Sequence, residues 1–153
     1  MTTHLGDLTL SPALDHLDHP GLLAPVVEQA LRQWSRGGEA TVSPIDADLA
    51  DTAAFCEAYR VPLTSSANCV VVAGKREGVE RIAACVVRAD TRVDVNNVVK
   101  GLLDVRKASF LSMDRAIAES QMEYGGITPI GLPTARRLLI DRRYFHKGGC
   151  IPA

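Results

Sequence analysis

Residues 122–133 read MEYGGITPIGLP, a stretch in which three glycines and two prolines separate hydrophobic residues. Glycine permits positive φ and lets another molecule approach the main chain, whereas proline restricts φ and removes an N–H donor. This pattern predicts a stiff, shaped loop. The amide groups of Gly125 and Gly126 are suited to a carbonyl oxygen, a phosphate or a developing oxyanion. An ordinary turn has the same composition, so these residues alone leave both interpretations open.

The bulk properties are those of a single globular domain spanning residues 1–153. Hydrophobic residues make up 46% of the chain and charged residues 23%, and the net charge is −1. A near-neutral chain does not coat nucleic acid by charge alone, although a local basic patch can still hold one RNA end. Such a patch, or a solvated edge, is predicted near the C-terminus by Arg136, Arg137, Arg142, Arg143 and Lys147, which lie beside His146 and a single acid, Asp141.

Cysteine and histidine spacing argues against a metal site. The four cysteines form no C-x-x-C pair and have no zinc-ligand spacing with the four histidines. We therefore expect no metal and no cofactor. The N-terminus has no basic segment followed by an apolar run, and no stretch approaches 18 apolar residues, so neither secretion nor a membrane span is expected. These features favour a cytoplasmic protein with reduced thiols.

Hydrophobic periodicity and turn residues predict interspersed helices and strands. Because no regular βαβ rhythm is present, a mixed or antiparallel sheet flanked by helices is expected, an α/β protein of the α+β type. The expected elements are an irregular lead-in over 1–20, a helix over 22–34, a helix from a Ser43 capping box to about residue 59, a β-hairpin of strands 68–73 and 81–87, a helix capped by Asp94, a strand over 106–111, a short helix capped by Ser112 and a buried strand over 138–140.

The loop resembles a known family motif. Residues 125–133 are similar to the GGI-[ST]-P-x-G-L-P loop of the YbaK/prolyl-tRNA synthetase-associated editing-domain family, whose members deacylate mischarged tRNA. The resemblance extends upstream, in the same order, through 94–100, 82–87, 69–73 and 61–63. It implies a mixed, largely antiparallel, barrel-like sheet with surrounding helices.

The resemblance also implies a function. The expected activity is that of a trans-acting aminoacyl-tRNA deacylase that acts on the 3′ end of a mischarged tRNA. The expected substrate is tRNA for proline carrying a small non-cognate amino acid, and prolyl-tRNA synthetase is a candidate partner. The implied catalytic residues are Asn68, Gly126 and Thr128, and the implied substrate-binding residues are Cys69, Gly125, Ile127, Pro129, Gly131 and Asp141. The expected hairpin register, rather than the resemblance, adds Arg88 to the substrate-binding residues.

The main departure from the family pattern is Asn68, which stands where relatives have lysine at the start of the first hairpin strand. Asparagine can still donate a hydrogen bond, but it has no charge and a shorter reach. An active hydrolase therefore remains one hypothesis. A catalytically weakened relative that binds an acceptor end, a nucleotide or an amino-acid derivative is a second, and an interaction module of a synthetase complex is a third.

The hairpin register decides which other side chains reach the pocket. A turn near Glu77 sets Asn68 opposite about residue 86 and places Arg88 on the same side, while Cys69 faces Cys85. A one-residue slip would move Arg88 to the opposite face, where it is a solvated charge. In a reducing compartment the two cysteines are expected to pack as core residues.

Two interpretations also remain open at the C-terminal end. Asp141 either accepts a bond from the substrate or pairs with Arg142 or Arg143. Beyond Asp141 the resemblance fades, because relatives continue through another strand whereas this chain stops at Ala153. A shortened end would leave a sheet edge uncovered and favour a homodimer over a monomer.

Overall fold

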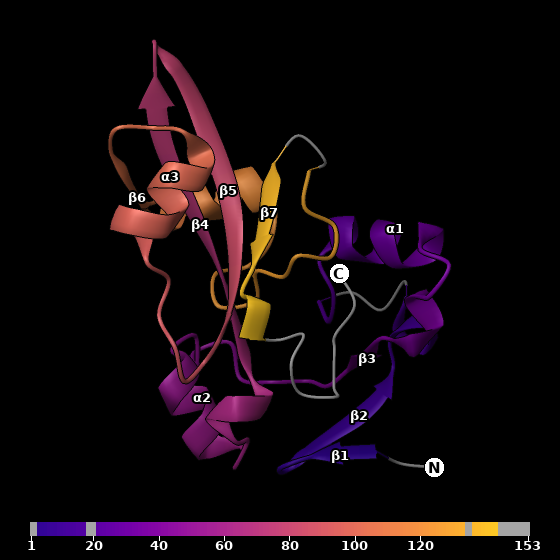
Figure 1. Cartoon of the computed structure of the whole chain (residues 1–153). Coiled ribbons are helices and arrows are strands. Elements are labelled where there is room, and N and C mark those ends of the chain that lie inside the picture. Colours follow the sequence, from indigo (N-terminus) through magenta and orange to yellow (C-terminus); the bar gives the residue numbers. More distant parts are fainter. Residues whose placement is uncertain (1–2, 18–20, 134–135, 144–153) are drawn as a thin grey trace.

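The computed structural model describes residues 3–17, 21–133 and 136–143 and contains two β-sheets with helices packed against them (Figure 1). The larger sheet has the strand order β6-β4-β5-β7, and the smaller sheet has the order β1-β2-β3. The mixed α+β class expected from the sequence is confirmed. The barrel-like closure is not seen, because in the described residues the larger sheet is open, with β6 and β7 at its edges.

The larger sheet is built on one long hairpin. Strands β4 (Ala67–Arg76) and β5 (Val79–Arg88) pair antiparallel along their whole length, β6 (Ala108–Phe110) adds antiparallel to β4, and β7 (Arg137–Ile140) adds parallel to β5. Valine and isoleucine favour this buried, pleated setting. The connection is a two-residue turn at Glu77 and Gly78, shorter than the expected loop over 74–78.

The short turn sets a register one residue away from the predicted one. Asn68 is opposite Val87, Cys69 is opposite Val86, and Ala67 is opposite Arg88. Since side chains alternate between faces, Arg88 lies on the opposite face of the hairpin from Asn68, and Cys69 does not face Cys85. The predicted register was therefore wrong.

Each face of the hairpin is covered by a different segment. On one face, Val72, Ala83 and Cys85 pack against a π-helical turn at Val95–Val99 and α3 (Lys100–Leu103), which Asp94 caps as predicted. On the other face, Val71, Ala73 and Ile82 contact Leu111 and Ile127, which flank the predicted helix α4 (Met113–Ser120) and its Ser112 cap. The glycine-rich loop is thus anchored on the sheet by Ile127.

Residues 3–17 form regular elements rather than an irregular lead-in. Strands β1 (Thr3–Leu5), β2 (Leu8–Pro12) and β3 (Thr41–Val42) form the smaller sheet, and a 3-10 turn at Ala13–His16 follows β2. The predicted lead-in was wrong because Leu5, Leu8 and Leu10 flank a tight turn and pack against Cys56 and Val61. The predicted first helix is confirmed as α1 (Pro25–Gln33), which buries Val27 and Leu31.

The second helix begins later than the capping-box pattern indicated. Helix α2 spans Thr52–Ala58, and the Asp51 carboxylate accepts a hydrogen bond of 3.0 Å from the Ala54 N–H. Residues 43–51 form a loop instead, in which the Asp46 carboxylate accepts a bond from the Asp48 N–H and the Asp46 N–H donates to the Tyr59 hydroxyl. These local bonds compete with helix formation. Residues 43–51 therefore form a loop that contributes to the lining of the candidate site.

Candidate active site

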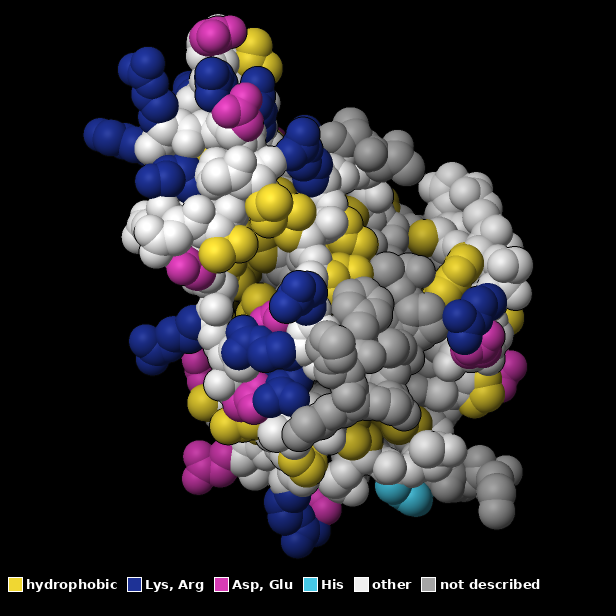
Figure 2. Space-filling model, viewed as in Figure 1, with side chains coloured by type: hydrophobic (Ala, Val, Ile, Leu, Met, Phe, Trp, Pro, Cys, Tyr) yellow, Lys and Arg dark blue, Asp and Glu magenta, His cyan; other side chains and the backbone are white. Residues whose placement is uncertain are grey.

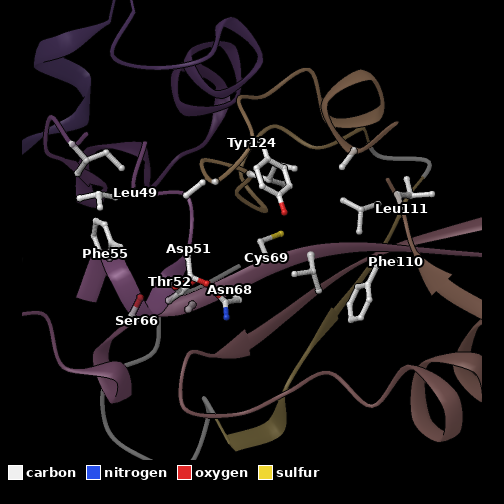
Figure 3. Close-up of a pocket in the computed structure, with 18 residues that line it drawn as sticks. Leu49, Asp51, Thr52, Phe55, Ser66, Asn68, Cys69, Phe110, Leu111 and Tyr124 are labelled. Carbon is white, nitrogen blue, oxygen red and sulfur yellow. Dashed lines mark hydrogen bonds between the residues drawn. The ribbon is translucent and has the colours of Figure 1, made fainter. Parts of the chain in front are cut away.

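A cavity of about 730 Å³ opens beside the first half of β4, which within the described residues pairs with β5 on one side and with no strand on the other. Strand β6 pairs only with residues 72–74, and the Leu111 N–H donates to the Val71 carbonyl at 2.9 Å just beyond that ladder. The cavity walls come from residues 45–55, from the start of β4, from the end of β6 with α4, and from residues 124–127 (Figure 3). The site thus combines segments that are far apart in the sequence.

Asn68 lines this cavity from β4 and is tied to α2. Its Oδ1 accepts a hydrogen bond from the Thr52 hydroxyl. Within the described residues, no acceptor is paired with its Nδ2, so this donor remains for a ligand. Asp51, Thr52 and Asn68 stand together on one wall of the cavity (Figure 3). Asp51 is the one charged side chain among the lining residues, all of which belong to the described part of the chain.

Cys69 follows Asn68 on β4 and also lines the cavity, and Figure 3 shows the Tyr124 hydroxyl directed toward its sulfur. Burial, with a smaller contribution from Cys85, raises the pKa of the Cys69 thiol to about 12. Burial likewise raises the pKa of Cys85 to about 11. Neither sulfur is a thiolate near neutral pH, and a thiol is a poor nucleophile. Cys56, Cys69 and Cys85 are free cysteines.

The glycine-rich loop does not present two converging amides as predicted. The Gly126 N–H donates to the Glu123 carbonyl at 2.9 Å and is already engaged. Gly125 has φ +85°, and a Cβ placed there would lie 2.7 Å from the Cβ of Ala50. Gly125 therefore permits a close contact between the loop and residue 50, which closes one side of the cavity.

The predicted site residues of this loop divide between two cavities. Ile127 lines the first cavity alone, Gly126 and Thr128 line only a second cavity of about 340 Å³ next to the start of α1, and Gly125 lines both. The Thr128 hydroxyl accepts a bond from the Ile130 N–H at 3.3 Å. Pro129 and Gly131 line neither cavity. A Cβ on Gly131 would lie 2.6 Å from the Val26 carbonyl oxygen, so this glycine packs the loop onto α1.

Arg88 and Asp141 also lie outside both cavities. Arg88 forms a two-pronged ion pair with Asp90, at 2.9 and 2.5 Å. Asp141 accepts bonds from the Arg143 guanidinium, which holds the pKa of this carboxyl below its usual range. Asp141 is therefore paired with Arg143, which was one of its two expected roles. Arg88 is paired with Asp90, and the geometric reason for placing it beside Asn68 no longer holds.

Comparison with known proteins assigns the fold to a family. The family model described as the aminoacyl-tRNA editing domain matches residues 46–151, well over half of the chain. This chain belongs to that family. The editing-domain match begins after the smaller sheet and includes every residue lining the first cavity except Ile45. No curated protein was found to be similar to the chain.

One solved structure is similar to this editing domain. The crystal structure of hypothetical protein APE2540 aligns with a TM-score of 0.55 and 18% sequence identity. The alignment covers 64% of this chain and 62% of that chain, so the chain spans less than two thirds of the length of that protein. At this identity the likeness shows the fold alone.

The basic segment of the editing domain is largely paired within the described residues. Arg136 pairs with Glu119, Arg137 donates to the Leu102 carbonyl, and Arg143 pairs with Asp141. Figure 2 shows dark blue and magenta side chains intermixed on this face rather than a continuous basic surface. His146, Lys147 and Cys150 lie outside the described residues, as does any strand after residue 143.

Sequence reasoning missed Asp51, Thr52 and Tyr124, which line the cavity of the editing domain. The signal for Asp51 was present, since aspartate directly before Thr-Ala-Ala is a good N-cap. It was overlooked because the helix was expected to begin eight residues earlier. No group of three or more metal-ligating side chains occurs in residues 3–17, 21–133 and 136–143. Over the same part of the chain, no helix is long and apolar enough to cross a bilayer.

Proposed function

We propose that this editing domain hydrolyses the ester bond of a mischarged aminoacyl-tRNA, with tRNA for proline carrying a small non-cognate amino acid as the substrate. The observation that carries the proposal is the cavity at the open edge of β4, where Asn68 retains an unused donor. Family membership supports the acceptor end of tRNA as the ligand. We also propose a cytoplasmic location, where aminoacyl-tRNA is used, and prolyl-tRNA synthetase as a candidate partner.

Hydrolysis of the ester requires, first, that the site hold the ester carbonyl group. The Val71 carbonyl faces β6, and alternation along the strand directs the Cys69 N–H and C=O to the same edge, beyond the end of the β6 pairing. The Cys69 N–H and the Asn68 Nδ2 are therefore donors at one end of the cavity. Donors aimed at the carbonyl oxygen stabilise the negative charge that develops when a nucleophile attacks.

The second requirement is a nucleophile. The ester is activated, so a water held in the cavity is sufficient, and the neutral Cys69 thiol takes no covalent part. The water oxygen bonds to the carbonyl carbon, the bond from that carbon to the ribose oxygen breaks, and the ribose oxygen takes a proton. The products are a free amino acid and a tRNA with an intact 3′ hydroxyl.

Two observations favour a second candidate, a relative that binds the acceptor end without turnover. Asn68 supplies no positive charge, and the Gly126 amide is engaged by the Glu123 carbonyl. Loss of one oxyanion donor in an enzyme costs about 100- to 1,000-fold in rate. In this case the cavity would keep its shape and its ligand while catalysis is weak.

A deacylation screen separates the two candidates. The screen measures hydrolysis of four esters, alanyl, cysteinyl, seryl and threonyl, each carried on tRNA for proline and on other tRNAs. The proteins compared are the wild type, Asn68→Ala and the control Gln29→Ala. Gln29 is an exposed residue of α1. We expect turnover that Asn68→Ala slows strongly and Gln29→Ala leaves unchanged. Binding without turnover, together with activity gained by Asn68→Lys, would support the second candidate. Folded protein that neither binds nor deacylates any member of the panel would exclude both.

A further inference from the structure

The first cavity has an unbalanced charge. Among the described residues, its lining contains one carboxylate, that of Asp51, and no lysine or arginine. The remaining polar side chains are neutral, because Thr52, Ser66, Asn68 and Tyr124 carry hydroxyl or amide groups and the pKa of Cys69 is raised to about 12. A cavity of this composition suits a ligand with one positive charge close to apolar groups.

The Asp51 carboxylate has a free oxygen. Oδ1 caps α2 by accepting from the Ala54 N–H at 3.0 Å, whereas no described group is paired with Oδ2. The cap also orients the carboxylate, because it holds the side chain at the start of the helix. In Figure 3 the side chain stands beside Thr52 and Asn68, on the wall where we place the ester carbonyl.

An aminoacyl ester carries its positive charge at a matching distance. Its α-amino group is two bonds from the carbonyl carbon, and α-amino groups are largely protonated at neutral pH. A substrate whose carbonyl oxygen is held by Asn68 and Cys69 therefore has its ammonium group within a short reach of that wall. Thr52 occupies the Asn68 Oδ1, which leaves Asp51 as the available anionic acceptor in the cavity lining.

We propose that Asp51 binds the α-ammonium group of the substrate and makes the site selective for aminoacyl esters with a free amino group. An ester whose amino group is acylated carries no positive charge there and leaves the Asp51 carboxylate without a partner. The site therefore binds such an ester more weakly. Asp51 is thus a specificity-determining residue. The inference rests on the proposed function, since it concerns the same site and the same ester.

The test compares alanyl-tRNA with N-acetylalanyl-tRNA in the wild type, Asp51→Asn and the control Gln29→Ala. Asparagine caps a helix about as well as aspartate, so this substitution removes the charge and retains α2. Thermal unfolding verifies that each variant is folded. We expect the wild type and Gln29→Ala to prefer the free amine by about tenfold or more in kcat/KM, the lower end of the coupling measured for close charge pairs. Asp51→Asn is expected to lose most of this preference.

Binding of non-hydrolysable analogues distinguishes failure of this inference from failure of the hydrolase proposal. The probes are 3′-deoxy-3′-alanylamido-adenosine and its N-acetyl derivative. Preferential binding of the free amine, abolished in Asp51→Asn, supports the inference even if no ester is hydrolysed. Equal binding of the two analogues, no binding of either, or a preference that persists in Asp51→Asn would overturn it.

Discussion

The Thr52 hydroxyl donates a hydrogen bond to the Oδ1 of Asn68 and so joins the first turn of α2 to the start of β4. This bond fixes which end of the Asn68 amide faces the helix. It leaves Nδ2 as the donor available to a ligand. Asp51 directly precedes Thr52 in the chain. The wall of the cavity is therefore a single hydrogen-bonded unit contributed by two elements.

Replacing Thr52 by valine should impair activity more than stability. Valine retains the shape of threonine but removes the hydroxyl, so the Asn68 amide is free to rotate. We expect a loss of about 1 kcal/mol in the free energy of unfolding, typical of one hydrogen bond, and a distinctly larger relative loss in kcat/KM. Thr64→Val, at an exposed position, is the matched control. Equal kcat/KM in Thr52→Val and the wild type would contradict an orienting role.

Substitution by alanine should have a larger effect on stability at Gly125 than at Gly126. At Gly125 the new Cβ meets Ala50 at 2.7 Å and φ is +85°, whereas at Gly126 the nearest contact is the Glu123 oxygen at 3.5 Å. We expect Gly125→Ala to lower the free energy of unfolding by about 1–3 kcal/mol and to reduce deacylation. Gly126→Ala should be close to the wild type in denaturant titrations. A larger effect at Gly126 would contradict this ranking, which depends on the room available for a Cβ at each position.

Gly131 should be required for packing of the loop on α1. A Cβ there would lie 2.6 Å from the Val26 carbonyl oxygen, and main-chain atoms cannot move aside as a flexible side chain can. Gly131→Ala is expected to lower the melting temperature. Gly101→Ala is the control, because nothing lies within 4 Å of its Cβ position and alanine favours helix by about 1 kcal/mol. It should leave the melting temperature unchanged or raise it.

The raised thiol pKa values of Cys69 and Cys85 should make the protein less stable at alkaline pH. The pKa is raised to about 12 for Cys69 and about 11 for Cys85, above the value of about 8.5 in an unfolded chain. The folded state therefore retains protons that the unfolded state loses. Their contribution to stability is present below about pH 8.5 and declines as the pH rises toward the folded values. Denaturant unfolding between pH 7 and 10 measures the decline, which Cys69→Ala should reduce.

The same raised pKa predicts that Cys69 reacts slowly with iodoacetamide at pH 7.5, and that Cys69→Ala retains deacylation. Loss of activity in Cys69→Ala, with an intact fold, would argue for a direct role of the sulfur. Rapid alkylation of Cys69 in the folded protein would contradict the burial on which the prediction depends.

Local signals were sufficient for much of the fold. The Asp94 and Ser112 caps, the valine-rich hairpin and the strand that became β7 were all predicted, because each depends on residues within a few positions of one another. The same reasoning failed at residues 44–51. There the Tyr59 hydroxyl and the Asp46 carboxylate take up backbone donors, and these contacts prevent the first turns of the expected helix.

The sequence alone determined the family, the α+β class and the presence of a shaped loop at residues 125–131. Only the tertiary structure decided which residues share a cavity. A two-residue turn shifted the hairpin register, so Arg88 and Asn68 lie on opposite faces. In the loop, Ile127 lines only the first cavity, Gly126 and Thr128 line only the second, and Gly125 lines both. The physical reason is the sequence separation over which each interaction acts. Helix caps and strand periodicity depend on residues a few positions apart, whereas the strand register, the partners of the ion pairs and the cavity lining depend on contacts between distant segments.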